Sequence, residues 1–284
     1  MGFVYFDEFY KKYPRETLYF CEIFHYNGAV FGKEGGDTVG EVITVLSGKG
    51  GTGKTSVCAG IALALAEAGG DILCIDCDVG LRNLDIALGM SQVGALSFAD
   101  VAGGGYSLEQ AARHPEYPKL CFLTAPVNCG PGEIETPAFR DLLQEARQHY
   151  HYIFLDAPAG IDAGFALSAR YADRILLVTG ADPAAVRDAT RAGELLELMD
   201  KKDVRLVVNR LVPKLITTMS VTVDDIMDKA GLPLLGVVPE DYNVTLAAAF
   251  GMPIFQKTKR GAAAAFRRIA KRVRGMNVPI PLKR

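Results

Sequence analysis

The chain has 284 residues, of which 49% are hydrophobic and 23% are charged, enough apolar material for one large α/β domain or two small ones. Its net charge of −2 excludes a surface built throughout for nucleic acid, and no apolar run reaches the roughly eighteen residues of a membrane-spanning helix. The amino terminus lacks the order of basic, apolar and small residues typical of a signal peptide, so the six cysteines indicate thiols in a reducing compartment. We therefore expect a cytoplasmic protein.

Residues 1–39 differ in composition from the rest of the chain. Eleven of the 25 Phe and Tyr residues lie in the first 32 positions, without a helical or strand period, and a glycine-rich G-K-E-G-G-D follows. We interpret this segment as a poorly structured extension or an over-long gene model. An aromatic arm that binds a membrane or a partner is the alternative. We expect one domain over residues 40–278 and a short basic tail over 279–284.

Short apolar runs alternate with helical patterns from Glu41 onward. The predicted strands are Val42–Leu46, Ile72–Ile75, Leu120–Leu123, Tyr152–Leu155, Ile175–Val178, Leu206–Val208 and Leu234–Val238. The predicted helices are Lys54–Ala68, Pro137–Gln148, Pro183–Met199, Val223–Ala230 and Gly261–Arg274. Apolar runs rich in Val and Ile are typical of parallel strands buried on both faces. The alternation predicts an α/β fold with a doubly wound, mostly parallel sheet flanked by helices.

The segment S-G-K-G-G-T-G-K-T-S contains the phosphate-loop pattern between a predicted strand and a predicted helix. Glycines let backbone N–H groups turn towards phosphate oxygens, and the amino terminus of the helix adds its positive dipole end. We expect Lys54 to reach the β- and γ-phosphates of a nucleotide and the Thr55 hydroxyl to bind Mg²⁺. The other residues expected to bind the nucleotide are Gly48, Gly50, Gly51, Thr52, Gly53 and Ser56.

Acidic residues follow two of the predicted strands. Asp156 ends Y-I-F-L-D, whereas Asp76 and Asp78 end I-L-C-I-D-C-D. A Mg²⁺-nucleotide site needs carboxylates at the carboxyl ends of the strands beside the phosphate loop. A solvated surface turn is the usual explanation for such aspartates, but here both strands end in acid. We therefore predict that these carboxylates belong to the site, with Asp156 holding Mg²⁺.

Several motifs together resemble one family. K-G-G-T-G-K-T, with its second lysine Lys49, resembles the deviant Walker A motif of the ParA/MinD ATPase superfamily. D-C-D-V-G-L-R-N-L-D-I-A-L-G (76–89) and D-A-P-A-G-I-D-A-G-F (156–165) are similar to the switch I and switch II segments of its septum-site-determining MinD branch. V-V-N-R (207–210) and G-V-V-P-E-D (236–241) continue in the same order. The resemblance covers about 41–278, and the R-N pair in G-L-R-N-L-D is its most specific part.

The resemblance implies an ATPase that needs Mg²⁺ and forms a homodimer when it binds ATP. Lys54 would serve the nucleotide of its own subunit, whereas Lys49 would reach across the dimer to the phosphates bound by the other. A lysine supplied by the partner makes hydrolysis depend on dimerisation, much as an arginine finger supplied in trans does. ATP binding would then join the subunits, and hydrolysis would release them.

The resemblance also implies roles for residues outside the loop. Asp78 would position the attacking water, and Asn83 would help to sense the γ-phosphate. Asp76 and Asp156 would support the Mg²⁺ ion. The adenine base would be held by Asn209, Pro239, Glu240 and Asp241.

The same resemblance implies a role in placing the division septum. The ATP-bound form would recruit a MinC-like inhibitor, and a MinE-like or other activator would stimulate hydrolysis. Two alternatives stay open, namely a ParA-like ATPase that positions cargo or the nucleoid and a MinD-like regulator of flagellar number. Salt-dependent DNA binding would favour the former, although nucleic acid is the less favoured partner.

The chain departs from the family pattern at a few positions. Within the site, Thr52 replaces the commoner valine, Ser56 follows Thr55, and Asp162 stands where glutamate is usual; none of these changes removes a catalytic group. The family normally ends in a short amphipathic helix that enters the membrane surface. Here the last predicted helix has an apolar face, and the prolines of M-N-V-P-I-P-L-K-R forbid a further regular helix. The usual anchor is therefore not expected. The residues of that apolar face are Phe266, Ile269, Ala270 and Val273.

Residues 257–284 contain ten Lys and Arg and no acid, so the preceding 256 residues carry about −12. These cations are either the solvated face of a docked helix or a surface that attracts anionic lipid, at roughly 1 kcal/mol per charge near the membrane. In the second case the protein would be peripheral on the inner face of the cell membrane.

Two other patterns are not interpreted as sites. Cys74-x2-Cys77 spans a strand end, where residues three apart point to opposite faces, so buried thiols are expected. Cys129 precedes G-P-G, but no cysteine follows Asp156 to pair with it in an iron–sulfur site. His149 and His151 have no other ligands nearby in the sequence, so we expect no metal besides Mg²⁺.

Overall fold

The structure, a computed structural model, describes residues 39–127, 136–212, 218 and 222–280. The predicted amino-terminal extension, Cys129 and most of the predicted basic tail therefore lie outside the described residues. All further statements concern the unit that begins at Thr38.

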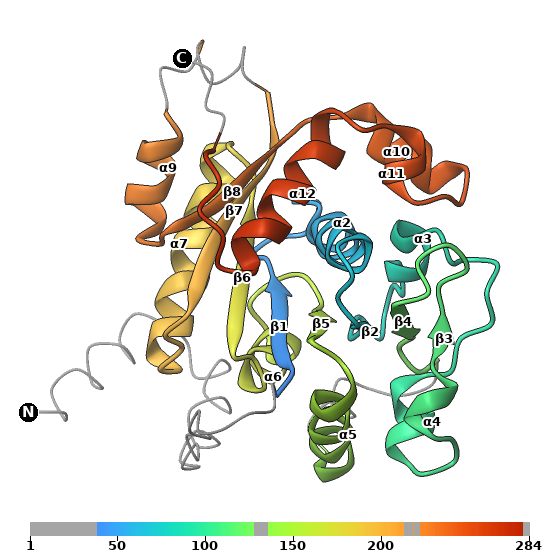
Figure 1. The fold of residues 1–284 in the computed structure, drawn as a ribbon. Coiled ribbons are helices and arrows are strands. Elements are labelled where there is room, and N and C mark those ends of the chain that lie inside the picture. The colour runs from blue at the N-terminus through green and yellow to red at the C-terminus, as the bar shows by residue number, and fades with distance from the viewer. Residues whose placement is uncertain (1–38, 128–135, 213–217, 219–221, 281–284) are drawn as a thin grey trace, which may run out of the picture. The chain divides into compact units, whose positions relative to one another are not determined.

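The described chain folds around one eight-stranded sheet in the order β3-β4-β2-β5-β1-β6-β7-β8. The strands are β1 (Glu41–Leu46), β2 (Ile72–Asp76), β3 (Ala112–Arg113), β4 (Leu120–Leu123), β5 (Tyr152–Asp156), β6 (Arg174–Thr179), β7 (Val204–Leu211) and β8 (Leu234–Pro239). All neighbouring pairs are parallel except β3 with β4. This order confirms the predicted doubly wound, mostly parallel sheet (Figure 1).

Helices cover both faces of the sheet (Figure 1). They are α2 (Lys54–Glu67), α3 (Leu84–Leu88), α4 (Phe98–Ala102), the 3₁₀ turn η3 (Leu108–Gln110), α5 (Pro137–His149), α6 (Ala163–Arg170), α7 (Pro183–Leu198), α9 (Val223–Ala230), α10 (Tyr242–Ala249), α11 (Ile254–Lys257) and α12 (Gly261–Val273). One face packs its apolar side chains against α2, α10, α11 and α12. The other face packs against α4, α5, α6, α7 and α9.

The phosphate-loop helix α2 is backed by the last helix of the fold. A Cβ atom on Gly60 of α2 would lie 2.3 Å from the ring of Phe266 in α12, so the two helices approach as closely as a glycine allows. Phe266 and Ile269 are both 1% exposed, which confirms the predicted apolar face of this helix. On its outer side, Arg267 donates two hydrogen bonds to the Glu67 carboxylate of α2. The last helix is therefore docked on the sheet.

All seven predicted strands and all five predicted helices are present, with bounds that differ at some ends. The largest difference is the strand predicted at Leu206–Val208, which extends over Val204–Leu211. Strand β3, the turn η3 and the helices α3, α4, α6, α10 and α11 were not predicted. The shortest of these elements carry too few positions to show a helical or strand period. Within the described part of the chain, no helix has both the length and the apolar character that crossing a bilayer requires.

Candidate nucleotide site

The loop from Ser47 to Gly53 connects the carboxyl end of β1 to the amino end of α2. Gly51 and Gly53 both have φ +81°, in the left-handed region that residues with a Cβ rarely adopt. Gly48 is also sterically required, because a Cβ there would lie 2.4 Å from the Asp188 carbonyl oxygen. The glycines of the motif therefore give the loop the conformation of a phosphate cradle, as the sequence predicted.

Lys54 begins α2, and its side chain is buried at 6% exposure. Its Nζ atom lies 2.8 Å from Oδ1 of Asp156, which ends β5, and 3.5 Å from Oγ1 of Thr55. Burial lowers the pKa of the Lys54 ammonium, but the neighbouring Asp156 carboxylate outweighs burial, so this pKa is raised and the lysine stays charged. Burial raises the pKa of Asp156, against the opposing effect of Lys54. Lys54, Thr55 and Asp156 are thus brought together as predicted.

Asp76 lies beside Asp156, because the two residues are register partners at the carboxyl ends of neighbouring strands β2 and β5. Its two carboxylate oxygens accept hydrogen bonds from the backbone N–H groups of Asp78 (2.9 Å) and Leu84 (3.1 Å). Burial, followed by the nearby Asp156 charge, raises the pKa of Asp76 to about 7. Two buried carboxylates side by side repel each other and attract a divalent cation, which would relieve both costs.

The segment that follows β2 lies partly in solvent. The Asp78 carboxylate accepts hydrogen bonds from the N–H groups of Gly80 and Leu81, both at 3.2 Å. Arg82 has φ +49° and donates two hydrogen bonds to the Thr124 hydroxyl, from Nε at 3.2 Å and from Nη2 at 3.1 Å. Asn83 occupies the N-cap position of α3, but its side chain makes no capping hydrogen bond there. In this arrangement Arg82 ties the segment to the residue after β4, a contact that the sequence did not predict.

Lys49, Gly50 and Gly51 are all exposed and are called the outer arm of the loop. The Ser47 hydroxyl donates a hydrogen bond of 3.0 Å to the Lys49 carbonyl oxygen, which fixes the backbone beneath the side chain. No ion pair joins the Lys49 ammonium to any other described residue. The two lysines of the motif therefore differ in position, since Lys54 faces the interior of its own site and Lys49 faces solvent.

The residues expected around adenine lie at the ends of β7 and β8. Asn209 is buried, and its side-chain N–H group donates a 2.8 Å hydrogen bond to the Thr52 carbonyl oxygen of the phosphate loop. Glu240, which follows Pro239, receives two hydrogen bonds from Arg210. Asp241 caps α10 through the N–H group of Asn243 and also accepts from the Ala262 N–H group, the start of α12.

A cavity of about 270 Å³ opens beside the phosphate loop. Thr55 and Ser56 lie on one side of it, Asn83 lies on another, and the rest of its wall is mainly apolar. The predicted site residues Ser56 and Asn83 are therefore close together although they come from separate motifs. Asp162, the other departure from the family pattern, caps α6 through the N–H group of Gly164 at 3.2 Å.

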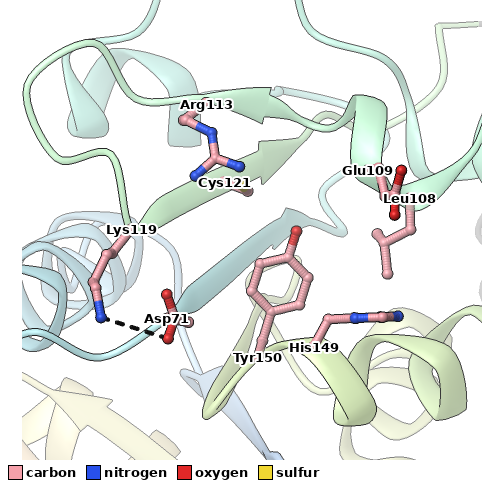
Figure 2. A pocket seen from close by; sticks show the side chains of 8 residues that line it. All are labelled: Asp71, Leu108, Glu109, Arg113, Lys119, Cys121, His149 and Tyr150. Atoms are coloured by element: carbon pink, nitrogen blue, oxygen red, sulfur yellow. Dashed lines mark ion pairs between the residues drawn. The ribbon is translucent and has the colours of Figure 1, made fainter.

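A larger cavity, of about 400 Å³, lies at the opposite end of the sheet (Figure 2). Asp71 and Lys119 line it and directly precede β2 and β4, and Tyr150 lies two positions before β5, so the cavity lies at the amino ends of parallel strands. Lys119 pairs with Asp71 at 3.7 Å, and His149 and Glu109 also face the cavity. Its cations and acids balance one another, so its size does not make it the nucleotide site.

The predicted buried thiols are confirmed where the structure describes them. Cys58, Cys74, Cys77 and Cys121 are free and buried. Cys74 and Cys77 belong to hydrophobic clusters on opposite faces of the sheet, which is why the C-x2-C spacing forms no metal or redox pair.

The sequence did not reveal three side chains that support the phosphate loop or the segment after β2. Ser47 and Arg210 donate hydrogen bonds to carbonyl groups of the loop, and Thr124 receives Arg82. A signal existed for Arg210, since it belongs to V-V-N-R, but only the asparagine of that motif was assigned a role. Nothing in the local sequence marks Thr124, because it lies 42 residues from Arg82.

The groups of the site fit a magnesium nucleotide. A buried lysine, a threonine hydroxyl and two buried carboxylates converge at the amino end of α2. The Thr52 hydroxyl of the loop is buried without a hydrogen-bond partner among the described residues, as expected for a group that a ligand would satisfy. Phosphates would replace Asp156 as the partner of Lys54, and Mg²⁺ would neutralise the released carboxylate. The fold and this set of groups define a P-loop nucleoside triphosphatase.

Comparison with known proteins places the chain more closely. The family model for the CobQ/CobB/MinD/ParA nucleotide binding domain matches residues 43–254. The septum site-determining protein MinD of Synechocystis sp. is 35% identical over 241 residues, which cover 84% of this chain and 91% of the relative. The chain belongs to the MinD family of ATPases.

Two solved structures of this family are similar over most of their length. The MinC:MinD cell division protein complex of Aquifex aeolicus matches with a TM-score of 0.76 and 34% identity, covering 86% of this chain and 98% of that chain. The septum site-determining protein MinD of Pyrococcus horikoshii, in complex with Mg-ADP, matches with a TM-score of 0.71 and 26% identity, covering 82% of this chain and 95% of that chain.

Proposed function

We propose that this protein is an ATP-dependent dimerising switch that takes part in placing the division septum. One observation carries the proposal: of the two lysines in a single phosphate loop, Lys54 is buried against Asp156, whereas Lys49 is exposed on the outer arm. A lysine that serves its own nucleotide points inward. A lysine that points outward from the same loop is placed to serve the nucleotide of a second copy. The similarity to MinD proteins supports the same conclusion.

The chemistry is the hydrolysis of ATP with Mg²⁺ as the metal, consistent with the Mg-ADP complex of the Pyrococcus horikoshii relative. Thr55, Asp76 and Asp156 would hold the ion, which supplies charge neutralisation at the phosphates when bound. Lys54 would hold the β- and γ-phosphates of the same subunit. Asp78, whose carboxylate is partly open to solvent, would orient the attacking water.

The remaining groups sense and hold the nucleotide. Asn83, at the start of α3, would report the γ-phosphate to the segment that follows β2. One N–H of the Asn209 amide donates to the Thr52 carbonyl, so its second N–H and its oxygen would bind adenine. The loop of Pro239, Glu240 and Asp241 would hold the base beside it. Hydrolysis removes the γ-phosphate, so the contacts that depend on it are lost and the dimer separates.

The output of such a switch is the binding of a partner to the ATP-bound dimer. The Aquifex aeolicus relative assembles with MinC, so we assign a MinC-like division inhibitor as the partner of this chain. An activator of the MinE type or another type would stimulate hydrolysis and end the bound state. The cycle therefore alternates between recruitment of the inhibitor by the ATP-bound dimer and its release after hydrolysis.

We also propose contact with the inner face of the cell membrane. Six cations in and beside α11 and α12, five of them exposed and Arg268 half-buried, form no ion pair with another described residue, and charge attracts them to anionic lipid. Each subunit alone would bind weakly, but an ATP-linked dimer doubles the number of contacts. These residues are Lys257, Lys259, Arg260, Arg268, Lys271 and Arg274.

Mixing two inactive variants tests whether Lys49 acts in trans. Lys49→Ala keeps Asp78 and its own nucleotide site, whereas Asp78→Ala keeps Lys49 but cannot orient water. A mixed dimer contains one site with Asp78 from one subunit and Lys49 from the other. We expect each variant alone to be inactive in a steady-state phosphate-release assay and the mixture to recover turnover. If the mixture stays as inactive as its components, or if Lys49→Ala turns over normally, Lys49 does not act across a dimer.

Liposome sedimentation tests the membrane proposal separately. The full chain is incubated with vesicles of anionic lipid or of neutral lipid, with ATP or with ADP. We expect sedimentation only with anionic vesicles and ATP. Equal absence from all pellets would remove membrane contact and would leave the ATPase assignment intact.

A further inference from the structure

We propose that Arg210 is a positioning residue for the arm of the phosphate loop that carries Lys49. The inference rests on the proposed role of Lys49 in a dimer. Arg210 lies outside the loop, at the carboxyl end of β7. Three features of the molecule bear on this role, namely the backbone conformation of Arg210, the partners of its guanidinium and the contacts of the loop backbone.

The backbone of Arg210 is in the left-handed region. Among the described residues, only Arg82, Asp200 and Arg210 combine φ > 0 with a side chain, and Arg210 has φ +57°. Glycine would adopt this conformation without strain, so an arginine here carries a backbone cost that the contacts of its side chain must offset. The pairing of β7 with β8 is irregular between Val208 and Leu211, which is where the strained residue turns its side chain towards the loop.

The guanidinium of Arg210 joins two parts of the nucleotide site. Its Nε and Nη2 atoms donate to the two carboxylate oxygens of Glu240, at 2.8 Å and 3.1 Å, in a bidentate pair. Its Nη1 atom donates to the Gly51 carbonyl oxygen at 3.2 Å. The Glu240 carboxylate fixes the orientation of the guanidinium, and the guanidinium in turn fixes the Gly51 carbonyl.

The arm that Arg210 holds has little other support. Gly50 and Gly51 follow Lys49, and a Cβ built on Gly51 would meet no atom within 4 Å. A Cβ on Gly50 would just meet the Ala159 side chain, at 4.0 Å. Two consecutive glycines with so few neighbours have many backbone conformations of similar energy. The adjacent residue, Asn209, already fixes the Thr52 carbonyl, and Ser47 fixes the Lys49 carbonyl. With the Arg210 bond to Gly51, three side chains donate hydrogen bonds to the carbonyl groups of Lys49, Gly51 and Thr52.

These bonds have a consequence for the inner side of the loop. A peptide whose carbonyl is held outward presents its N–H group inward, which is the orientation that phosphate needs. The same bond fixes the direction in which the Lys49 side chain leaves the loop. Arg210 and Glu240 are partly exposed, so we expect their pair to add little to stability and to act on position instead.

The test uses Arg210→Gly, which removes the guanidinium and relieves the backbone strain. Asp200→Gly is the matched control, because Asp200 has φ +58° and pairs with the exposed Lys202, away from the loop. Both variants should fold at least as well as the parent. Nucleotide affinity, steady-state turnover and amide hydrogen exchange of residues 48–52 are measured for each full-length protein.

We expect Arg210→Gly to lower kcat by about tenfold, since a misplaced group costs one to two orders of magnitude, with the nucleotide dissociation constant changed by less than about threefold. Amide exchange in residues 48–52 of the nucleotide-free protein should become faster. Asp200→Gly should match the parent in every measurement. Unchanged kcat or unchanged exchange in Arg210→Gly would overturn the proposal. An equal fall in affinity and kcat would also overturn it, because Arg210 would then be a nucleotide ligand.

Lys49→Ala, measured beside these variants, separates this proposal from the one on which it rests. If Lys49→Ala retains normal turnover, the dimer mechanism is wrong. If Lys49→Ala is inactive and Arg210→Gly is not, the dimer mechanism stands and only the positioning role of Arg210 fails.

Discussion

The two ends of the parallel sheet carry the same kinds of charged side chain in different arrangements. At the amino ends of the strands, Lys119 pairs with Asp71 on the wall of a wide cavity (Figure 2), and both side chains are exposed to water. At the carboxyl ends, Lys54 pairs with Asp156 and both side chains are buried. Water solvates the first pair, so its separation costs little. The second pair cannot be separated without another partner for each charge.

The burial of charge explains why the nucleotide chemistry is expected at the carboxyl ends of the strands only. A buried cation and buried carboxylates hold unfavourable energy that a phosphate and a divalent ion would relieve. Around the larger cavity, Lys119 and Asp71 pair with each other and are solvated by water. Cavity size alone would select the wrong end of the molecule, whereas burial of charge selects the right one.

Replacement of the buried lysine should have the largest effect. Lys54→Ala removes the cation that holds the phosphates, and we expect ATP affinity to fall by about 100-fold, since hydrogen bonds to charged groups are worth up to about 3 kcal/mol. The measurement is titration with a fluorescent nucleotide. Lys119→Ala is the matched control at the other end and should bind nucleotide like the parent. Similar losses in the two variants would break the comparison.

The stability of the nucleotide-free protein should depend on pH, because a buried carboxylate at the carboxyl ends of the strands is costly to ionise. The pKa of Asp76 is raised from 3.8 to about 7 in the folded protein, so the folded state binds more protons than the unfolded state between these values. Stability without nucleotide should therefore fall as pH rises, by about 2 kcal/mol between pH 5 and pH 8. Urea unfolding of the nucleotide-free protein at the two pH values measures this change. Asp76→Asn should remove most of it, and an equally steep fall in that variant would assign the effect elsewhere.

Substitution of two glycines, Gly53 and Gly69, should give the smallest difference in nucleotide affinity. Both Gly53, in the loop, and Gly69, after α2, have positive φ, but a Cβ on Gly53 would lie 2.3 Å from the Asn209 side chain whereas one on Gly69 would meet nothing. Gly69→Ala should cost only the backbone strain, about 1 kcal/mol of stability. Gly53→Ala should in addition weaken ATP binding by about tenfold, because Asn209 must move. Equal nucleotide affinity in the two variants would show that the close approach is unimportant.

The central parts of the fold and site could be predicted because their signals are local. The strands are buried on both faces and are therefore continuous apolar runs. Lys54 and Asp156 each adjoin such a run, and parallel strands bring their carboxyl ends to one edge. Chain order and strand direction were thus sufficient to place these two residues together.

The contacts that the sequence did not reveal are long-range. Arg210 holds a carbonyl 159 positions away, and a strained backbone angle aims it there. Backbone hydrogen-bond acceptors such as the Gly51 carbonyl have no sequence signature, because every residue has one. Strand β3 has two residues, too few for any periodic pattern. The roles of Asp78, Asn83 and the adenine residues came from family resemblance, and they remain predictions.

The packing of α12 against α2 has a consequence for synthesis. The phosphate loop emerges from the ribosome early, but the helix that it begins is covered by the ring of Phe266, more than two hundred residues later. A nascent chain that lacks α12 exposes the apolar side of α2, so the nucleotide site can reach its final rigidity only after α12 has been synthesised. The folding of this site is therefore timed by α12, and loss of that helix would disable a motif more than two hundred residues before it.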